Sequence, residues 1–286
     1  MKEKENCIGK YNDLAFKLSK ETTKKYSTSF YSASKFFDSQ TRTAIHSVYG
    51  FVRLADEIVD SFHDYDKKTL LDKFEEEYSL SCELGISTNP ILHSFLITVK
   101  EYNIPKEYID NFLRSMRYDL EKKEYKTKEE AKDYIYGSAD VVGLMCLKIF
   151  CRNNNELFDK LYNPAMRLGS AFQKVNFLRD LKEDILSLGR TYFADFNIEK
   201  FDEETKLELI KEIEEDFYEA KLGIKDLPEG SQLALIIAYK YYLRLLKKIK
   251  QTPAEKVIEK RIRVNDFNKL ILLINTIIKY KIKPGI

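Results

Sequence analysis

Two segments of the chain carry polar side chains in a single line along an otherwise apolar helical pattern. In VYGFVRLADEIVD, residues 48–60, steps of four, three and four residues place four side chains within about 60° of arc on a helix: Tyr49, Arg53, Asp56 and Asp60. In LGSAFQKVNFLRDLKED, residues 168–184, a second line consists of Gly169, Gln173, Asn176, Asp180 and Asp184. Acids one helical turn apart repel each other, so each line favours a bound cation.

Acid pairs at this spacing also arise by chance. With 46 acids in 286 residues, about seven such pairs are expected, and most would lie on a solvated surface. The pair Asp56 and Asp60 differs because it borders an apolar arc and lies one turn from Arg53. Buried like charges are costly unless a cation compensates them. We therefore expect the two lines to face each other as a cage for a divalent metal.

The ligand types favour Mg²⁺, with Mn²⁺ as an alternative, over zinc or copper. Mg²⁺ shares its coordination with substrate phosphates, so the expected ligand of the cage is a diphosphate. Arg53, Arg179 and Arg190 are predicted to complete it as bidentate partners. A di-iron carboxylate bundle, the weaker alternative, needs Glu-x-x-His on two helices, and no histidine here follows Glu at that spacing.

The elements that would position these residues are helices. Apolar residues recur at three- and four-residue steps over 41–63, and similar stripes predict helices near 67–84, 91–102, 106–121, 129–151, 155–188, 203–224, 230–251 and 254–281. Turn or capping residues separate these ranges, while Pro164 should kink a helix or mark a short junction. No alternation of period two is long enough to predict a strand.

Composition supports an all-α fold. The 286 residues are 44% hydrophobic, which supplies a full core, and 10 Gly with 6 Pro is about half the usual share. Few turns favour long helices over a sandwich or barrel. We expect residues 1–286 to form a single all-helical domain of about ten helices around a large interior.

Charge is balanced overall but uneven along the chain. The net charge of +2 gives no reason to expect nucleic acid as a partner. From Ala238 to Ile286, thirteen Lys/Arg stand against three acids, a local charge of about +10. A solvated helix face is the commoner explanation, and the alternative is contact with an anionic membrane surface or a phosphorylated substrate.

The cysteines and apolar runs bear on location. Four cysteines without CxxC spacing and a start without an apolar leader predict a reduced, cytoplasmic protein without a metal-thiolate site. The run from Leu270 to Ile278 is far shorter than the ~18–20 residues of a membrane span, so no transmembrane anchor is expected. Peripheral contact with the inner face of the cytoplasmic membrane is compatible with the basic C-terminal part.

Four sequence blocks together resemble one protein family. ADEIVD (55–60) and FQKVNFLRDLKEDILSLGRTYF (172–193) resemble the two signature motifs of the squalene/phytoene synthase family, and YSTSF (26–30) and YIYGSADVVGLM (134–145) support them. The blocks lie in order at family-like spacing, and a thinner similarity extends from about residue 20 to 265. Within the family, the pattern is most similar to bacterial phytoene synthases.

The resemblance implies an isoprenoid-synthase fold, with a central cavity whose mouth carries two Asp-rich motifs that hold Mg²⁺. The implied metal ligands are Asp56, Asp60, Asn176, Asp180 and Asp184, with Glu57 adjacent to the first motif. The implied diphosphate-binding residues are Ser27, Ser29, Arg53 and Arg179. Positions around the substrates are Tyr49, Tyr134, Ala139, Val142, Gly143, Gly169 and Gln173, and, by a looser match, Tyr242 and Arg261. The four Asp residues and Tyr134 form the implied catalytic set.

The small residues of this set and two departures from the family pattern also carry expectations. Gly143 and Gly169 are expected to let a prenyl chain pass close to the backbone. Asp140 stands where Gly is usual, and its carboxylate either acts on a carbocation or caps a helix turn, the second being favoured. Ala194 replaces a usual Pro, which affects only the local loop.

The implied reaction is the head-to-head (1-1′) condensation of two geranylgeranyl diphosphates to phytoene through a cyclopropylcarbinyl (prephytoene) diphosphate, the first step of carotenoid biosynthesis. Released diphosphate and Tyr134 are the candidate bases for the final proton loss. A squalene synthase using NADPH or a dehydrosqualene synthase, both acting on farnesyl diphosphate, is the alternative within the family. A non-catalytic helical assembly protein is the alternative outside enzymes. Downstream carotenoid enzymes are expected partners.

Overall fold

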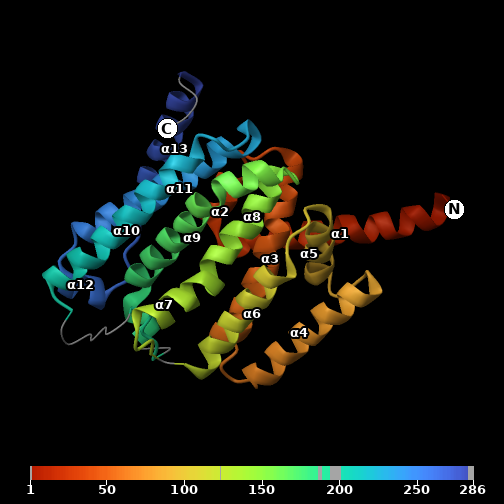
Figure 1. Ribbon diagram of the computed structural model, residues 1–286, viewed down its shortest axis with the longest axis horizontal. Helices are drawn as coiled ribbons and strands as arrows, with labels where there is room; N and C mark the ends of the chain where they lie inside the picture. The colour runs from red at the N-terminus through yellow and green to blue at the C-terminus, as the bar shows by residue number, and fades with distance from the viewer. Residues whose placement is uncertain (1, 123, 186–188, 194–200, 283–286) are drawn as a thin grey trace.

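The computed structural model describes residues 2–122, 124–185, 189–193 and 201–282, which fold into helices (Figure 1). In chain order these are α1 (Lys2–Tyr26), α2 (Thr28–Ser34), α3 (Ser39–Ser61), α4 (Lys67–Leu84), α5 (Pro90–Glu101), α6 (Lys106–Glu121), α7 (Lys128–Ile135), the π-helix η1 (Tyr136–Asp140), α8 (Val141–Cys151), α9 (Asn155–Glu183), α10 (Glu203–Ile224), α11 (Glu229–Lys250), α12 (Ala254–Glu259) and α13 (Asp266–Ile282). In these ranges the extended contacts amount to a lone bridge between Glu124 and Thr191. The all-α prediction is confirmed.

At two of the turns between the predicted helices, an asparagine side chain caps the helix that follows. Asn89 accepts hydrogen bonds from the backbone N–H groups of Ile91 and Leu92 at the start of α5, where Pro90 occupies the first turn. Asn154 accepts from the N–H of Leu157 at the start of α9. These bonds satisfy backbone donors that have no partner within the helix.

Three sequence expectations differ from the structure. Helices α1 and α2 precede the first predicted range, and the predicted helix 254–281 is two helices, α12 and α13. Of the two outcomes expected at Pro164, a kink or a junction, the junction is wrong, because α9 continues through this residue. The Pro164 ring packs against Gly223 of α10, where an added Cβ would lie 2.4 Å from the ring Cβ.

The predicted helix 129–151 contains the π-helical segment η1, which changes the direction of its side chains. In an uninterrupted α-helix, Gly143 would lie about 180° from Tyr134. The extra residue of a π turn reduces this offset by about 100°. As a result Tyr134, Ala139, Val142 and Gly143 all reach the wall of the same cavity.

Helices α3, α6, α8 and α9 run through the middle of the molecule, with α10 and α11 on one side and α4 and α5 on the other (Figure 1). One contiguous apolar cluster joins these helices, and Phe51 and Phe95 stack in it with ring centroids 4.0 Å apart. Helices α8 and α9 approach closely at Gly143 and Gly169. A Cβ on Gly169 would lie 2.9 Å from the carbonyl oxygen of Ala139, so helix packing itself requires these glycines.

The helical stretch Lys128–Cys151 has the length and hydropathy of a membrane span, with a mean hydropathy of 1.4 in its most apolar window. However, 61% of that window is buried inside the protein. This burial is typical of a core helix, and Val141, Leu144 and Met145 are fully buried there. The expectation of no transmembrane anchor rested on the shorter run from Leu270 to Ile278 and did not consider this stretch.

Burial of His46 gives a pH-dependent stability. Burial, with Arg42 and Lys20 nearby, lowers the pKa of His46 to about 4, and its Nε2 lies 2.8 Å from Ser34 Oγ. In the unfolded chain the pKa is about 6.5, so protonation favours unfolding. This contribution to stability is complete above about pH 6.5 and is lost as the pH falls toward 4. The full shift corresponds to about 3 kcal/mol.

We therefore expect the stability difference between the wild type and His46→Gln to shrink by about 2 kcal/mol between pH 7 and pH 4.5. Glutamine keeps an N–H donor for Ser34 Oγ, whose own hydrogen goes to the carbonyl oxygen of Tyr31, but it does not titrate. Urea unfolding at both pH values measures the difference. His63→Gln is the control, because His63 is exposed. Parallel curves for His46→Gln would contradict the prediction.

Candidate active site

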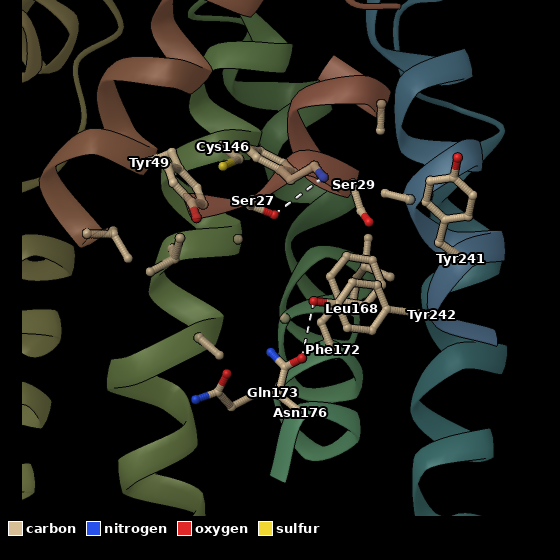
Figure 2. Close-up of a pocket in the computed structure, with 18 of the residues that line it drawn as sticks. Ser27, Ser29, Tyr49, Cys146, Leu168, Phe172, Gln173, Asn176, Tyr241 and Tyr242 are labelled. Carbon is tan, nitrogen blue, oxygen red and sulfur yellow. Dashed lines mark hydrogen bonds between the residues drawn. The ribbon is translucent and has the colours of Figure 1, made fainter. Parts of the chain in front are cut away.

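A cavity of about 950 Å³ lies between α2, α3, α8, α9 and α11, and Figure 2 shows part of its wall. Apart from Glu57 and Arg190, the site residues predicted from the sequence lie in this wall. Its volume is at the upper end of the range for small-molecule sites, ~300–1,000 Å³. Carboxylates and arginines gather at the end formed by the C-terminal turns of α3 and α9. The opposite end is apolar, with Phe37 and Phe150 stacked at 5.4 Å.

The first acidic pair lies on the cavity side of α3. Asp56 is half-buried, and burial together with the charge of Asp60 raises its pKa to about 8. Asp60 accepts a hydrogen bond of 2.8 Å from Arg190 Nη1. Among the carboxylates of α3, the negative charge of Asp56 is therefore the one least compensated by a cation.

The second acidic pair lies at the end of α9, opposite the first. Arg179 donates to both carboxylate oxygens of Asp180, at 3.0 and 2.5 Å, and Arg261 Nε lies 2.8 Å from Asp180 Oδ1. Burial, then the charges of Asp180 and Asp60, raise the pKa of Asp184 to about 7. The acids of both motifs line the same end of the cavity, and the charge of Asp60 acts on Asp184.

Asp119 of α6 belongs to the same acidic group, and the sequence analysis missed it. Its side chain is 5% exposed and lies in the cavity wall, 3.4 Å from Arg190 Nη1. Burial raises its pKa to about 7, against the opposing effect of Arg190. The signal was present, because Asp119 continues the apolar stripe of Phe112 and Met116 at helical spacing.

Tyr134 holds Asp119 in place. Its hydroxyl donates to both carboxylate oxygens, at 2.9 and 3.0 Å, and burial raises its pKa well above the usual value. Its ring lies among those of Tyr125, Phe177 and Tyr192, with Tyr192 stacked at 5.1 Å. A neutral phenol that already donates to a carboxylate is a poor proton acceptor, so the geometry argues against Tyr134 as a general base.

The donor chemistry of this end of the cavity fits Mg²⁺. Carboxylate and amide oxygens are offered by Asp56 and Asp60 on one side and by Asn176, Asp180 and Asp184 on the other. Carboxylates whose pKa is raised by their neighbours favour a divalent cation, which lowers their repulsion. As the side chains stand, no three His, Cys, Asp or Glu of the described residues converge as metal ligands, since arginines hold several of these acids.

Two residues of the cavity wall each carry a polar atom whose hydrogen-bonding capacity is unused. Arg53 Nε and Ser138 Oγ are buried, and neither has a hydrogen-bond partner in the described part of the chain. The other end of the Arg53 guanidinium pairs with Glu57 and lies over the ring of Tyr26, 4.5 Å from its centroid. Buried polar atoms normally have partners, so these two mark where a bound molecule would accept or donate.

The predicted diphosphate residues differ in what they do in the structure. Ser27 caps α2, because its Oγ accepts from the N–H of Phe30 at 3.4 Å, whereas Ser29 only lines the cavity (Figure 2). Arg190 pairs with acids instead of facing the cavity. Glu57 pairs with Arg53 and is not in the cavity wall.

Aromatic rings line the part of the cavity next to the acids. Phe172 and Tyr242 stack with centroids 3.9 Å apart, and the Tyr242 hydroxyl donates to Asn176 Oδ1 at 3.3 Å (Figure 2). On the opposite wall, Phe30 and Tyr49 stack at 5.2 Å. Such faces are apolar and carry partial negative charge, so they suit an apolar chain and a cation alike.

Asp140 does neither of the things expected of it. It is not in the cavity wall, and it forms no cap; it accepts a hydrogen bond of 2.7 Å from Ser170 of α9. Burial raises its pKa to about 7. Its carboxyl group therefore joins η1 to α9 behind the cavity. Ala194 lies outside the described residues.

An all-helical fold around one large cavity, with acids from facing helices at one end, defines the class of isoprenoid synthases. The sequence pattern of the squalene/phytoene synthase family matches residues 23–268. The chain belongs to this family. Its members are prenyltransferases, which confirms the predicted enzyme class.

Individual proteins support the same placement. Phytoene synthase 2, chloroplastic, of Zea mays is 30% identical over 175 residues, which are 60% of this chain and 43% of that protein. A 15-cis-phytoene synthase of Enterobacter agglomerans is 25% identical over 274 residues, 87% of this chain and 90% of that protein. The crystal structure of a dehydrosqualene synthase in complex with ligand is similar in fold, with a TM-score of 0.80 at 22% identity, and covers 94% of this chain and 98% of that one.

Proposed function

We propose that this protein condenses two geranylgeranyl diphosphates head to head to phytoene. The observation that carries the proposal is the division of one large cavity into an end of acids and arginines and a long apolar remainder. Along α3, the wall extends from Ile45 to Asp60, about 22 Å at 1.5 Å per residue. The relatives named phytoene synthase support this choice of product.

The chain's own residues would bind and orient the diphosphate groups. Arg53 and Arg179 are half-buried cations in the wall, and Arg53 Nε has no partner among the described side chains. Guanidinium groups bind phosphate oxygens in pairs, so they hold the diphosphate and stabilise its charge as the bond to C1 breaks. Mg²⁺, held by Asp56, Asp60, Asn176, Asp180 and Asp184, would supply further neutralisation of the leaving diphosphate.

The apolar wall would guide the allylic cation. It holds the two chains with C1 of one beside the double bond of the other and keeps water away. The rings of Phe172 and Tyr242 offer their faces to positive charge near the acidic end. After the second ionisation and rearrangement to the 1-1′ hydrocarbon, one proton leaves. Released diphosphate is the candidate base, since Tyr134 already donates to Asp119.

The decisive experiment incubates the purified protein with each prenyl diphosphate and Mg²⁺, with and without NADPH, and identifies the hydrocarbon. We expect phytoene from geranylgeranyl diphosphate, equally with and without NADPH. Preferred formation of dehydrosqualene or squalene from farnesyl diphosphate would replace the proposed substrate. No release of diphosphate from any prenyl substrate would favour the non-catalytic alternative.

The apolar end of the cavity should set the chain length. Ala33 lies in the wall there, 3% exposed, on the helix that leads to Phe37. A phenylalanine in its place would occupy the space of the last prenyl units. We expect Ala33→Phe to lower turnover of the C20 substrate at least about tenfold relative to the C15 substrate. Product analysis with mixed substrates measures the ratio.

Ala33→Ser is the matched control, because serine has nearly the same volume and should leave the ratio unchanged. An equal loss with both substrates in Ala33→Phe would show that the substitution acts on the fold or on diphosphate binding, not on chain length. The cytoplasmic location, the use of Mg²⁺ and the downstream carotenoid enzymes as partners stay predictions.

A further inference from the structure

Helix α13 presents an apolar face to solvent along its whole length. Thr276 is its one fully buried residue in the described chain. Large apolar side chains that are 42% to 79% exposed recur at three- and four-residue steps: Phe267, Leu270, Ile271, Ile274, Ile278 and Ile282. At 100° per residue they fall within an arc of about 120°, which we call the α13 face. Figure 1 shows α13 at the edge of the molecule, projecting beyond α11.

Polar contacts on the other side of α13 fix which face points outward. The Tyr241 hydroxyl of α11 donates to the carbonyl oxygen of Lys269 at 3.3 Å, and the Tyr280 hydroxyl donates to Gln232 Oε1 at 2.9 Å. Both contacts join α13 to α11. The side of α13 that packs against α11 is therefore the polar one, and its large apolar side chains point away from the core.

Lysines that form no ion pair with a described residue lie on α13 and on the helices next to it. Lys221, Lys240 and Lys279 come from α10, α11 and α13, and none of them forms an ion pair with a described residue. After burial, the charges of Lys279 and Lys221 are what lower the pKa of Lys240, so the three ammonium groups lie within electrostatic reach. Lys281 adds a further exposed cation within the arc of the α13 face, at the C-terminal end of the helix. An apolar strip with cations at its edge is complementary to anionic headgroups over acyl chains.

A second copy of the chain is a weaker occupant. At 42% to 79% exposure, the six side chains of the α13 face leave on the order of 600 Å² of accessible surface. Stable protein interfaces bury about 800 Å² per partner. A bilayer has no such minimum, since an interfacial helix inserts its apolar face alone.

We propose that the α13 face binds the surface of an anionic lipid bilayer, with Phe267, Ile274 and Ile278 among the acyl chains and the lysines at the headgroups. The proposal stands independently of the reaction. It places the cavity next to the membrane, because Lys269 of α13 also lies in the cavity wall.

Sedimentation with vesicles tests both parts of the proposal. We expect the wild type to bind phosphatidylcholine vesicles containing phosphatidylglycerol more tightly than phosphatidylcholine alone, and less tightly at high salt. The double variant Ile274→Ser, Ile278→Ser should lose binding about tenfold or more to both. Lys279→Gln with Lys281→Gln should lose about tenfold or more on anionic vesicles only. Leu80→Ser with Leu84→Ser, an equally spaced and exposed pair on α4, should change nothing.

The absence of tryptophan allows a second measurement that does not depend on loss of binding. Phe267→Trp places one indole on the α13 face, and Tyr65→Trp places one at a site with the same exposure, 70%, on the loop after α3. Anionic vesicles should shift the emission of the first to shorter wavelength and expose it to lipid-borne quenchers. The second should keep the emission of a solvated indole.

Three results would overturn the proposal. One is equal vesicle binding by the wild type and the Ile274→Ser, Ile278→Ser variant. Another is no binding to either vesicle type together with unshifted Phe267→Trp emission. The third is a wild-type dimer that the serine variant converts to a monomer, in which case a second copy covers the α13 face.

Discussion

Replacing Asp56 by Asn should reduce turnover at least about a hundredfold while leaving the protein folded. Asp56 combines half-burial, a pKa raised to about 8 and the repulsion of Asp60, so its ionised form is unfavourable without a ligand cation and the fold does not depend on its charge. Loss of a metal-bound charge costs several kcal/mol in the transition state. Diphosphate release from a prenyl substrate at saturating Mg²⁺ measures the activity, and urea unfolding measures the stability, which should hold or rise slightly.

Two further variants sharpen this test. Asp180→Asn should abolish turnover as well, but without a gain in stability, because Asp180 pairs with both Arg179 and Arg261. Asp64→Asn, an exposed acid beyond the end of α3, is the matched control and should keep wild-type activity. More than about a tenth of wild-type turnover in Asp56→Asn would exclude its role as a ligand.

Replacing Arg190 by Met should destabilise the protein by about 3 kcal/mol, the largest effect we expect on the fold. Arg190 is 7% exposed and compensates Asp119, which is 5% exposed, and Asp60. Removing one partner of a buried pair leaves an uncompensated charge, which costs about 3–5 kcal/mol when both are buried. Because Asp60 is half-exposed and can be solvated, we expect a loss of stability at the lower end of this range. Urea unfolding of the variant measures the loss.

The loss of stability caused by Arg190→Met should depend on pH. The pKa of Asp119 is already about 7 with Arg190 present, and removal of the cation raises it further. A folded-state pKa above the unfolded value means that stability falls as the pH rises. The deficit should therefore be largest above pH 7 and shrink toward pH 5. Lys106→Met, which removes an exposed pair with Asp110, should cost less than about 1 kcal/mol at either pH.

The sequence predicted the acidic lines well because each lies within one helix. Asp56 and Asp60 are one turn apart, and so are Asp180 and Asp184, so helical periodicity alone places each pair on one face. The family resemblance added the residues from other helices, such as Tyr242, and these also lie in the cavity wall. Their roles in binding and catalysis stay predictions.

What periodicity could not give was the pairing between helices. Asp119 and Arg190 are 71 positions apart, and nothing in their local patterns shows that they meet. The same limit applies to Asp140, whose partner Ser170 lies on another helix. Helix ends without strong caps were not predicted either. The break between α12 and α13 is an example, because one apolar pattern continues across it.

The π-helical turn η1 has a consequence for how this protein can change by mutation. A codon lost from a loop shortens the loop, but a codon lost between residues 136 and 140 would convert the π turn into α-helix. Helix α8 would then rotate by about 100° and shift by about 1.5 Å against α7. Val142 would leave the cavity wall and Gly143 would no longer face α9, although every remaining side chain would keep its chemical identity. Insertions and deletions at this point therefore act on the shape of the cavity as a rotation, which substitutions alone cannot reproduce.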